Sequence, residues 1–154
     1  MTTHPKQPQD SDFEKRVRHS FASQPFMDLI GARITEVSPG GCAIYLPYKP
    51  ELTQQTGYFH AGIVSTMADN AGGYAALSLM PPGKEVLTVE YKINLLHPGK
   101  GDGLFSRGRV LKAGRTLTVC LVDVFNVTGE TQTLAATALM TMMGIDVKNS
   151  ASRS

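Results

Sequence analysis

Hydrophobic and polar residues alternate along most of this 154-residue chain, and such a period of two predicts β-strands. Short runs rich in glycine, proline and polar residues separate the alternating segments and predict turns. The short links make the later strands antiparallel neighbours. The strands are expected at residues 26–37, 42–48, 86–96, 104–112, 116–127 and 133–143.

One stretch, residues 54–80, departs from this pattern. After a turn at Gly57, hydrophobic residues recur there at helical spacing, and Pro81-Pro82-Gly83 ends the run. The residues on this spacing are Ile63, Val64, Met67, Ala68, Ala71, Tyr74, Ala75 and Leu79. A helix that is apolar nearly all round is expected to be buried. A long buried helix beside five or six antiparallel strands predicts an α+β fold in which the sheet wraps around the helix.

The two ends of the chain are polar. Residues 1–10 are expected to be a disordered lead, followed by a short helix with Phe13, Val17 and Phe21 on one face and Pro25 just beyond its end. This helix could be a flap over a pocket or could pack on the side of the domain, and we favour packing. The domain is expected to span residues 25–145, and residues 146–154 to form a flexible tail.

Composition and charge narrow the functional classes. A net charge of +2, with no basic helix, argues against nucleic acid as a partner. No run of 18 apolar residues and no signal peptide is present, so we expect a cytoplasmic protein that does not enter a membrane. Cys42 and Cys120 lack metal or redox spacing and are expected to be buried thiols. The histidines are scattered, and no metal site is predicted.

Asp69 is the one acid in the apolar helix. A carboxylate in such surroundings needs hydrogen-bond partners, and it could serve only to bond a neighbouring backbone group. We favour a catalytic role, because acids in apolar surroundings gather at functional sites. Gly72 and Gly73 each cost roughly 1 kcal/mol relative to alanine in a helix, which indicates that a sheet, another helix or a ligand approaches closely there.

The helix entry at Gly57–Gly62 carries small residues, so its first N–H groups are expected to be accessible to an anion or a developing oxyanion. Ala61 and Asp69 are eight residues apart, which is roughly 12 Å along one helix. One carbonyl group cannot contact both. If both act in one reaction, the donors of one subunit must meet the acid of another, and we therefore expect paired helices in a dimer.

Gln54, Gly57, His60-Ala61-Gly62 and Ala68-Asp69-Asn70 together resemble the hotdog-fold thioesterases, specifically the PaaI-type acyl-CoA thioesterases. The resemblance covers roughly residues 25–143. It implies a hotdog fold, hydrolysis of acyl-CoA thioesters, and a homo-oligomer that is a dimer or a dimer of dimers (homotetramer). It implies no cofactor, because coenzyme A belongs to the substrate.

The resemblance also implies a role for each matching residue. Asp69 would be the nucleophile or the base that activates water, and Thr88 would help to hold that water. The N–H group of Ala61, aided by the Gly62 N–H and the Gln54 side chain, would polarise the thioester carbonyl. His60 would cap the helix and not act as a base. Alanine at position 61 departs from the usual glycine, and a positive φ there would be strained.

Coenzyme A carries several phosphate charges, so cations are expected at the mouth of the site. We name Lys92, Lys112 and Arg115 as candidates, although basic residues on strands are commonly only solvated. The acyl group should contact apolar side chains, and the candidates for this lining are Tyr58, Phe59, Met67 and Leu87. The same side chains could instead be plain core.

Two other classes of protein stay open at this point. A hotdog dehydratase would need a histidine close to the acid, and His60 is about 13 to 14 Å along the helix from Asp69. A non-catalytic acyl-CoA sensor would keep the pocket without turnover. A DNA-binding sensor would need an additional basic module, for which the segment before Pro25 is too short.

Overall fold

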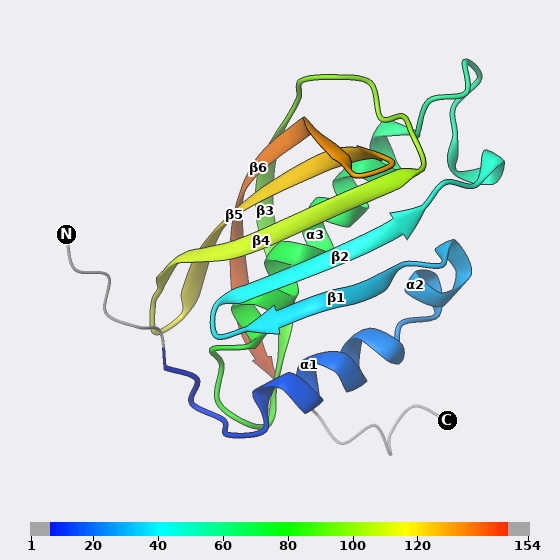
Figure 1. Ribbon diagram of the computed structural model, residues 1–154. Coiled ribbons are helices and arrows are strands. Elements are labelled where there is room, and N and C mark those ends of the chain that lie inside the picture. The colour runs from blue at the N-terminus through cyan, green and yellow to red at the C-terminus, as the bar shows by residue number, and fades with distance from the viewer. Residues whose placement is uncertain (1–6, 148–154) are drawn as a thin grey trace, which may run out of the picture.

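The computed structural model describes residues 7–147, in which six antiparallel strands curve around one long helix (Figure 1). The strand order is β1-β2-β4-β5-β6-β3, so β1 and β3 are the edges of the sheet. This arrangement confirms the expected α+β fold. The strands are β1 (Arg33–Ser38), β2 (Gly41–Pro47), β3 (Lys84–Leu95), β4 (Gly103–Ala113), β5 (Leu117–Thr128) and β6 (Thr131–Asp146).

The central helix α3 (Ala61–Leu77) packs on the concave face of the sheet. Its C-terminal half is buried from Ala71 onwards. The helix lies so close to β4 that a Cβ atom on Gly108 would be 2.3 Å from the carbonyl oxygen of Ala71. A Cβ atom on Gly72 would in turn be 2.9 Å from the sulfur of Met140. Glycine is therefore required at position 108 by backbone contact, whereas a side chain at position 72 would force Met140 to shift.

Residues 26–30 form a helix and not the start of the expected first strand. Helix α2 (Pro25–Ile30) begins with proline at its first position and ends at Gly31, whose φ of +81° is left-handed. Met27 and Ile30, three residues apart, are its buried side chains. Local turn chemistry at both ends thus overrides the apolar character of the segment, and β1 begins only at Arg33.

The N-terminal helix α1 (Phe13–Ala22) packs beside the sheet through Val17 and Phe21, as the sequence predicts. Its Arg16 donates hydrogen bonds to the carbonyl oxygens of Met80 (2.6 Å) and Pro81 (2.7 Å), just beyond the end of α3. The Asp10 carboxylate lies 3.0 Å from the same guanidinium group. Hydrogen bonds therefore hold α1 against the C-terminal end of α3.

The predicted ends of the domain need correction where the structure describes them. Gln9 donates a hydrogen bond to the carbonyl oxygen of Leu79, so the end of the expected disordered lead is held against the core. Strand β6 continues to Asp146, which forms an ion pair of 2.7 Å with Lys84. The remainder of the predicted lead and tail, residues 1–6 and 148–154, lies outside the described residues.

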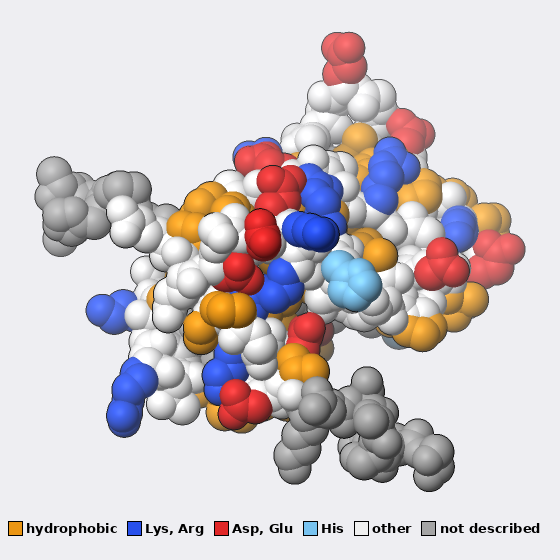
Figure 2. Space-filling model, turned by 90° about the horizontal axis from the view of Figure 1, so that it is seen from below, with side chains coloured by type: hydrophobic (Ala, Val, Ile, Leu, Met, Phe, Trp, Pro, Cys, Tyr) orange, Lys and Arg blue, Asp and Glu red, His pale blue; other side chains and the backbone are white. Residues whose placement is uncertain are grey.

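A short 3-10 helix η1 (Pro50–Leu52) leads from β2 toward the turn before α3. On the face shown in Figure 2, acidic and basic side chains are interspersed with apolar ones. Within residues 7–147, none of the helices has the length and apolar character needed to cross a membrane.

Candidate functional site

The first N–H group of α3, that of Ala61, has no hydrogen-bond acceptor among the described residues. His60 is the N-cap, and its Nδ1 atom accepts a hydrogen bond of 2.9 Å from the Gly62 N–H. The Ile63 N–H donates to the carbonyl oxygen of His60. Within residues 7–147, no hydrogen bond from the Ala61 N–H is found. Ala61 is therefore the accessible donor, whereas the Gly62 N–H, expected to assist it, is already engaged.

Alanine at position 61 is not strained. None of the non-glycine residues in the described part of the chain has a positive φ, and Ala61 is the first residue of the helix. The N–H group of this position is thus presented by ordinary helical backbone. The concern that replacing glycine there would distort the turn does not apply.

Gln54 and Ala61 line the same hollow, which has a volume of about 320 Å³. The Gln54 side chain both donates to the Thr56 hydroxyl and accepts from the Thr56 N–H, each at 2.6 Å. These two bonds hold the amide in a defined orientation beside the helix entry. Tyr58 and Phe59, named as acyl-lining candidates, line this hollow as well.

Asp69 and Thr88 meet although they are 19 positions apart in the sequence. The Thr88 hydroxyl donates a hydrogen bond of 2.6 Å to an Asp69 carboxylate oxygen. Asp69 is only partly buried, in contrast to the apolar surroundings expected from its sequence context. A carboxylate held by a hydroxyl and open to solvent on one side can accept a proton or attack an electrophile.

An open groove runs along α3 and the edge strand β3 at this point. On the helix side it is lined by Gly62, Ser65, Thr66 and Asp69, none of which is fully buried. On the strand side, a β-bulge at Val89 interrupts the register between Thr88 and Glu90. Thr88 pairs with Met142 and Tyr91 with Met140, so both face the helix side of the sheet. The bulge thus turns two side chains three positions apart toward the groove.

The two chemical halves of the site are separate within one chain. Ala61 and Asp69 lie on one straight element, roughly 12 Å apart by the helical rise. The hollow beside Ala61 and the groove beside Asp69 are lined by different residues. One protomer therefore offers a donor and an acid that cannot contact one carbonyl group together.

A second cavity, of about 330 Å³, lies on the other side of Asp69 and was not anticipated from the sequence. Tyr74 faces it, and Gln24, beyond the end of α1, donates hydrogen bonds to the Tyr74 hydroxyl and to the Asn70 side-chain oxygen. Burial raises the pKa of Tyr74, and its side-chain hydrogen bonds with Ser20 and Gln24 partly offset this rise. Among the lining residues of this cavity, Gly73 and Leu87 were singled out from the sequence as candidates for a ligand contact, but Tyr74 and Gln24 were not.

The remaining lining candidates divide between cavity and core. Leu87 is 50% exposed and lines the second cavity with Asp69. Met67 is fully buried in the hydrophobic core and lines none of the cavities found in the described residues, which favours the alternative that it is plain core. Its position on the helix points it at the sheet. The helical periodicity predicts a buried side chain but does not show whether that side chain contacts the sheet or a ligand.

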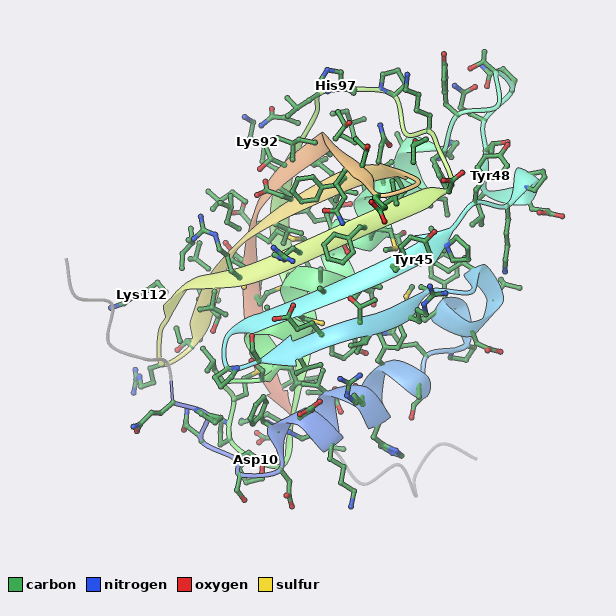
Figure 3. The ribbon with its side chains drawn as sticks, viewed as in Figure 1. Asp10, Tyr45, Tyr48, Lys92, His97 and Lys112 are labelled. Carbon is green, nitrogen blue, oxygen red and sulfur yellow. The ribbon has the colours of Figure 1, made fainter. Side chains whose placement is uncertain are left out.

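The candidate cations lie on different parts of the sheet, and Figure 3 labels two of them, Lys92 and Lys112. Lys92 is on the edge strand β3. Lys112 and Arg115 are at the turn between β4 and β5, and β4 is three strands away from β3, which is about 14 Å at the usual spacing. The structure does not bring these three cations together within one chain.

The family model described as the thioesterase superfamily matches residues 56–133. A protein from Saccharolobus solfataricus that carries a provisional esterase name is 31% identical over 105 residues, which are 68% of this chain and 72% of the relative. Human acyl-coenzyme A thioesterase 13 is 32% identical over 97 residues, covering 61% of this chain and 69% of its own.

Solved structures extend the likeness to nearly the whole fold. The crystal structure of a thioesterase family protein from Silicibacter pomeroyi is 45% identical, with a TM-score of 0.85, and covers 87% of this chain and 98% of its own. The PaaI protein from the phenylacetic acid degradation operon of E. coli shares the fold at 19% identity, with a TM-score of 0.79 over 89% of this chain and 96% of its own.

Proposed function

Because the chain belongs to the thioesterase superfamily, we propose that it hydrolyses acyl-CoA thioesters, with Asp69 as its acid and the Ala61 N–H as its oxyanion donor. The observation that carries the proposal is the 2.6 Å hydrogen bond from Thr88 to Asp69. It holds a carboxylate in the open groove of a helix whose N-terminus also offers an accessible N–H group. The likeness to human acyl-coenzyme A thioesterase 13 supports coenzyme A as the thiol part of the substrate.

A two-fold dimer would bring the separated halves together. If two copies of α3 pack antiparallel about an axis at Ser65, each residue lies opposite the one equally far on the other side of position 65. Asp69, four positions beyond Ser65, then faces Ala61, four positions before it. Each dimer would contain two equivalent sites, both made of residues from two chains.

The open groove and the edge strand support this pairing. Gly62, Ser65 and Thr66 leave room for a second helix, since their side chains are small. Strand β3 has β6 as its hydrogen-bonded neighbour on one side and is an edge on the other. Leu87 and Val89 on this strand are 50% and 52% exposed, an apolar area that a second copy would cover. A dimer of dimers would need a further surface in addition to this one.

The chemistry follows from the two groups. The thioester carbonyl accepts a hydrogen bond from the Ala61 N–H at the positive end of the helix, and such a donor contributes roughly 3 to 4 kcal/mol to the transition state. In one route, Asp69 takes a proton from water as the water oxygen attacks the carbonyl carbon. The carbonyl re-forms, the C–S bond breaks, and the thiolate of coenzyme A takes up the proton.

In the second route, an Asp69 oxygen attacks the carbonyl carbon itself. The thiolate leaves, and an anhydride between the acyl group and Asp69 forms, which water then hydrolyses. Thr88 serves both routes, because its hydroxyl orients the carboxylate. The proposed contacts of the coenzyme A phosphates remain Lys92, Lys112 and Arg115. Because Lys112 and Arg115 lie far from β3 in the same chain, they would have to contact coenzyme A bound at a site formed with another chain.

The test is a thiol-release assay on a panel of aliphatic and aromatic acyl-CoA esters, with wild type, Asp69→Asn and Asp123→Asn in parallel. Asp123 is the matched control because it lies on the outer face of β5, between the buried Val122 and Val124. We expect Asp69→Asn to lower kcat by about 10³-fold, within the range of general-base catalysis, and Asp123→Asn to leave it unchanged. Saturable binding without turnover by the wild type would instead indicate an acyl-CoA sensor.

A further inference from the structure

The cavity behind Asp69 combines an apolar side with a polar wall. Val86 and Leu87 of β3 line the apolar side, and Gly73 of α3 leaves the space open. A Cβ atom on Gly73 would meet only Val86, at an ordinary contact distance of 3.6 Å. Any larger residue at this position would occupy the cavity. The space therefore begins at Asp69 and Thr88 and is not filled by side chains of the chain itself.

The polar wall is a connected set of hydrogen bonds between three elements. The Gln24 amide donates to the Tyr74 hydroxyl, and the Tyr74 and Ser20 hydroxyl oxygens are 3.5 Å apart. Ser20 in turn donates a hydrogen bond of 3.0 Å to one carboxylate oxygen of Glu85. With Ser20 donating to Glu85, the Tyr74 hydroxyl is the donor to Ser20. The direction of donation thus runs from Gln24 to Glu85.

Glu85 is the last acceptor of this series, and one of its two carboxylate oxygens remains available within the described part of the chain. Among residues 7–147, neither a hydrogen bond nor an ion pair to its second oxygen, Oε1, is found. Glu85 lines the cavity and is partly buried. A carboxylate accepts strong hydrogen bonds from hydroxyl donors, and an acceptor that loses water without gaining a donor is costly. The wall is therefore suited to a guest that brings a hydroxyl group.

The distance from Asp69 to the polar wall limits the length of the molecule that can bind in the cavity. Glu85 precedes Thr88 by three strand residues, or about 10 Å, and Tyr74 follows Asp69 by five helical residues, or about 7.5 Å. An extended chain advances about 3.5 Å per three bonds, so this span corresponds to about six to nine bonds. A volume of about 330 Å³ is at the small end for ligand pockets.

We propose that this cavity receives the acyl group and selects a compact acyl chain that ends in a hydroxyl group, which donates to Glu85. The inference rests on the proposed function and deepens it, because it assigns the substrate class of the same site. Ser20 and Gln24 line this pocket, so the N-terminal segment contributes to specificity. Its helix α1 also packs on the side of the domain. Glu85 is the residue that determines specificity, and it takes no part in the chemical step.

The experiment compares two esters of equal length, omega-hydroxyhexanoyl-CoA and heptanoyl-CoA, which differ by a hydroxyl in place of a methyl group. We expect the wild type to prefer the hydroxy ester by at least about tenfold in kcat/KM, since a site that hydrogen-bonds a substrate hydroxyl discriminates against its analogue without one. Glu85→Met should remove this preference, because the hydroxy ester then has no carboxylate to donate to. Glu85→Gln, which keeps an acceptor oxygen, should restore part of the preference.

Glu130→Gln is the control for the loss of one acidic charge, because Glu130 is exposed in the turn between β5 and β6. It should behave as the wild type. Equal turnover of the two esters by the wild type, or an unchanged preference in Glu85→Met, would overturn the specificity inference while leaving the thioesterase function intact. Failure of the wild type to hydrolyse either ester or any acyl-CoA of the panel would overturn both.

Discussion

The two faces of helix α3 are built from similarly small residues for opposite reasons. On the covered face, Ala68, Ala71 and Gly72 are buried, and the backbone of Gly108 on β4 lies against the Ala71 carbonyl. On the open face, Ser65 and Thr66 line a groove along the edge strand β3. Small residues bring the sheet close on the first face. On the second they leave space that a single chain does not fill.

The adjacent glycines Gly72 and Gly73 show the contrast at its sharpest. A Cβ atom on Gly72 would be 2.9 Å from Met140 and 3.1 Å from Val122, so side chains of the packed sheet would have to shift to admit it. A Cβ atom on Gly73 would enter the cavity and make one ordinary contact, with Val86. Both glycines weaken the helix by a similar amount. Their neighbours decide that one serves packing and the other keeps a cavity open.

Gly108→Ala should have the largest effect on the covered face. Its Cβ atom would be 2.3 Å from a backbone oxygen, which has no flexible side chain to yield, so the helix and sheet must separate. We expect the free energy of unfolding to fall by about 3 kcal/mol, at the upper end for overpacking. Urea denaturation followed by circular dichroism measures this loss. A change below about 0.5 kcal/mol, the range of ordinary surface substitutions, would show that the contact is not a constraint.

Ser65→Arg tests the open face. A long charged side chain in the groove should prevent a second α3 from packing there, and activity should fall by about 100-fold, equivalent to about 2.7 kcal/mol. Light scattering should show the mass of one chain, 16.6 kDa, in place of a dimer. Lys15→Glu, at an exposed position on α1, is the control for a charge change elsewhere. An active dimer in Ser65→Arg would rule out pairing through this groove.

Thr88→Val should have a smaller effect on the same face. The substitution keeps the shape of the side chain but removes the hydroxyl that donates to Asp69, and we expect kcat to fall about tenfold, or about 1.4 kcal/mol. Steady-state kinetics compare it with Thr131→Val, which lies exposed at the start of β6. An unchanged kcat would mean that Asp69 is oriented without Thr88.

Gly73→Ala should have the smallest effect on stability, and of opposite sign to that of Gly108→Ala. The new methyl group fits beside Val86, and alanine favours the helix, so the free energy of unfolding should rise by about 0.5 to 1 kcal/mol. Thermal unfolding measures the gain. A loss of stability similar to that expected for Gly108→Ala would show that position 73 is as tightly packed as the covered face.

Much of the fold could be predicted from local patterns. The period of two predicted most of the strands, and the helical spacing after Gly57 predicted α3, because both reflect which side chains can be buried together. The segment at residues 26–30 was predicted wrongly as strand. There the proline at the start and the left-handed glycine at the end select a helix, and the apolar residues fit either element.

The candidate site could be predicted only in its parts. Asp69 stood out as an acid in an apolar helix, and the structure adds Thr88 at hydrogen-bond distance. Met67 was named as a lining candidate because it is apolar, with plain core as the alternative, and the structure buries it fully in the core. Ser20 and Glu85 gave no signal, since a contact between residues 65 positions apart leaves no local pattern.

The sequence by itself determined the class of the fold, the central helix and the identity of its acid, because burial patterns and turn chemistry act over a few residues. The tertiary structure decided which face of the helix is covered and which is open. It also brought Thr88 to Asp69 and lined a cavity with side chains from α1, α3 and β3. These features depend on how elements approach one another in space, and that approach is set by long-range packing against the sheet.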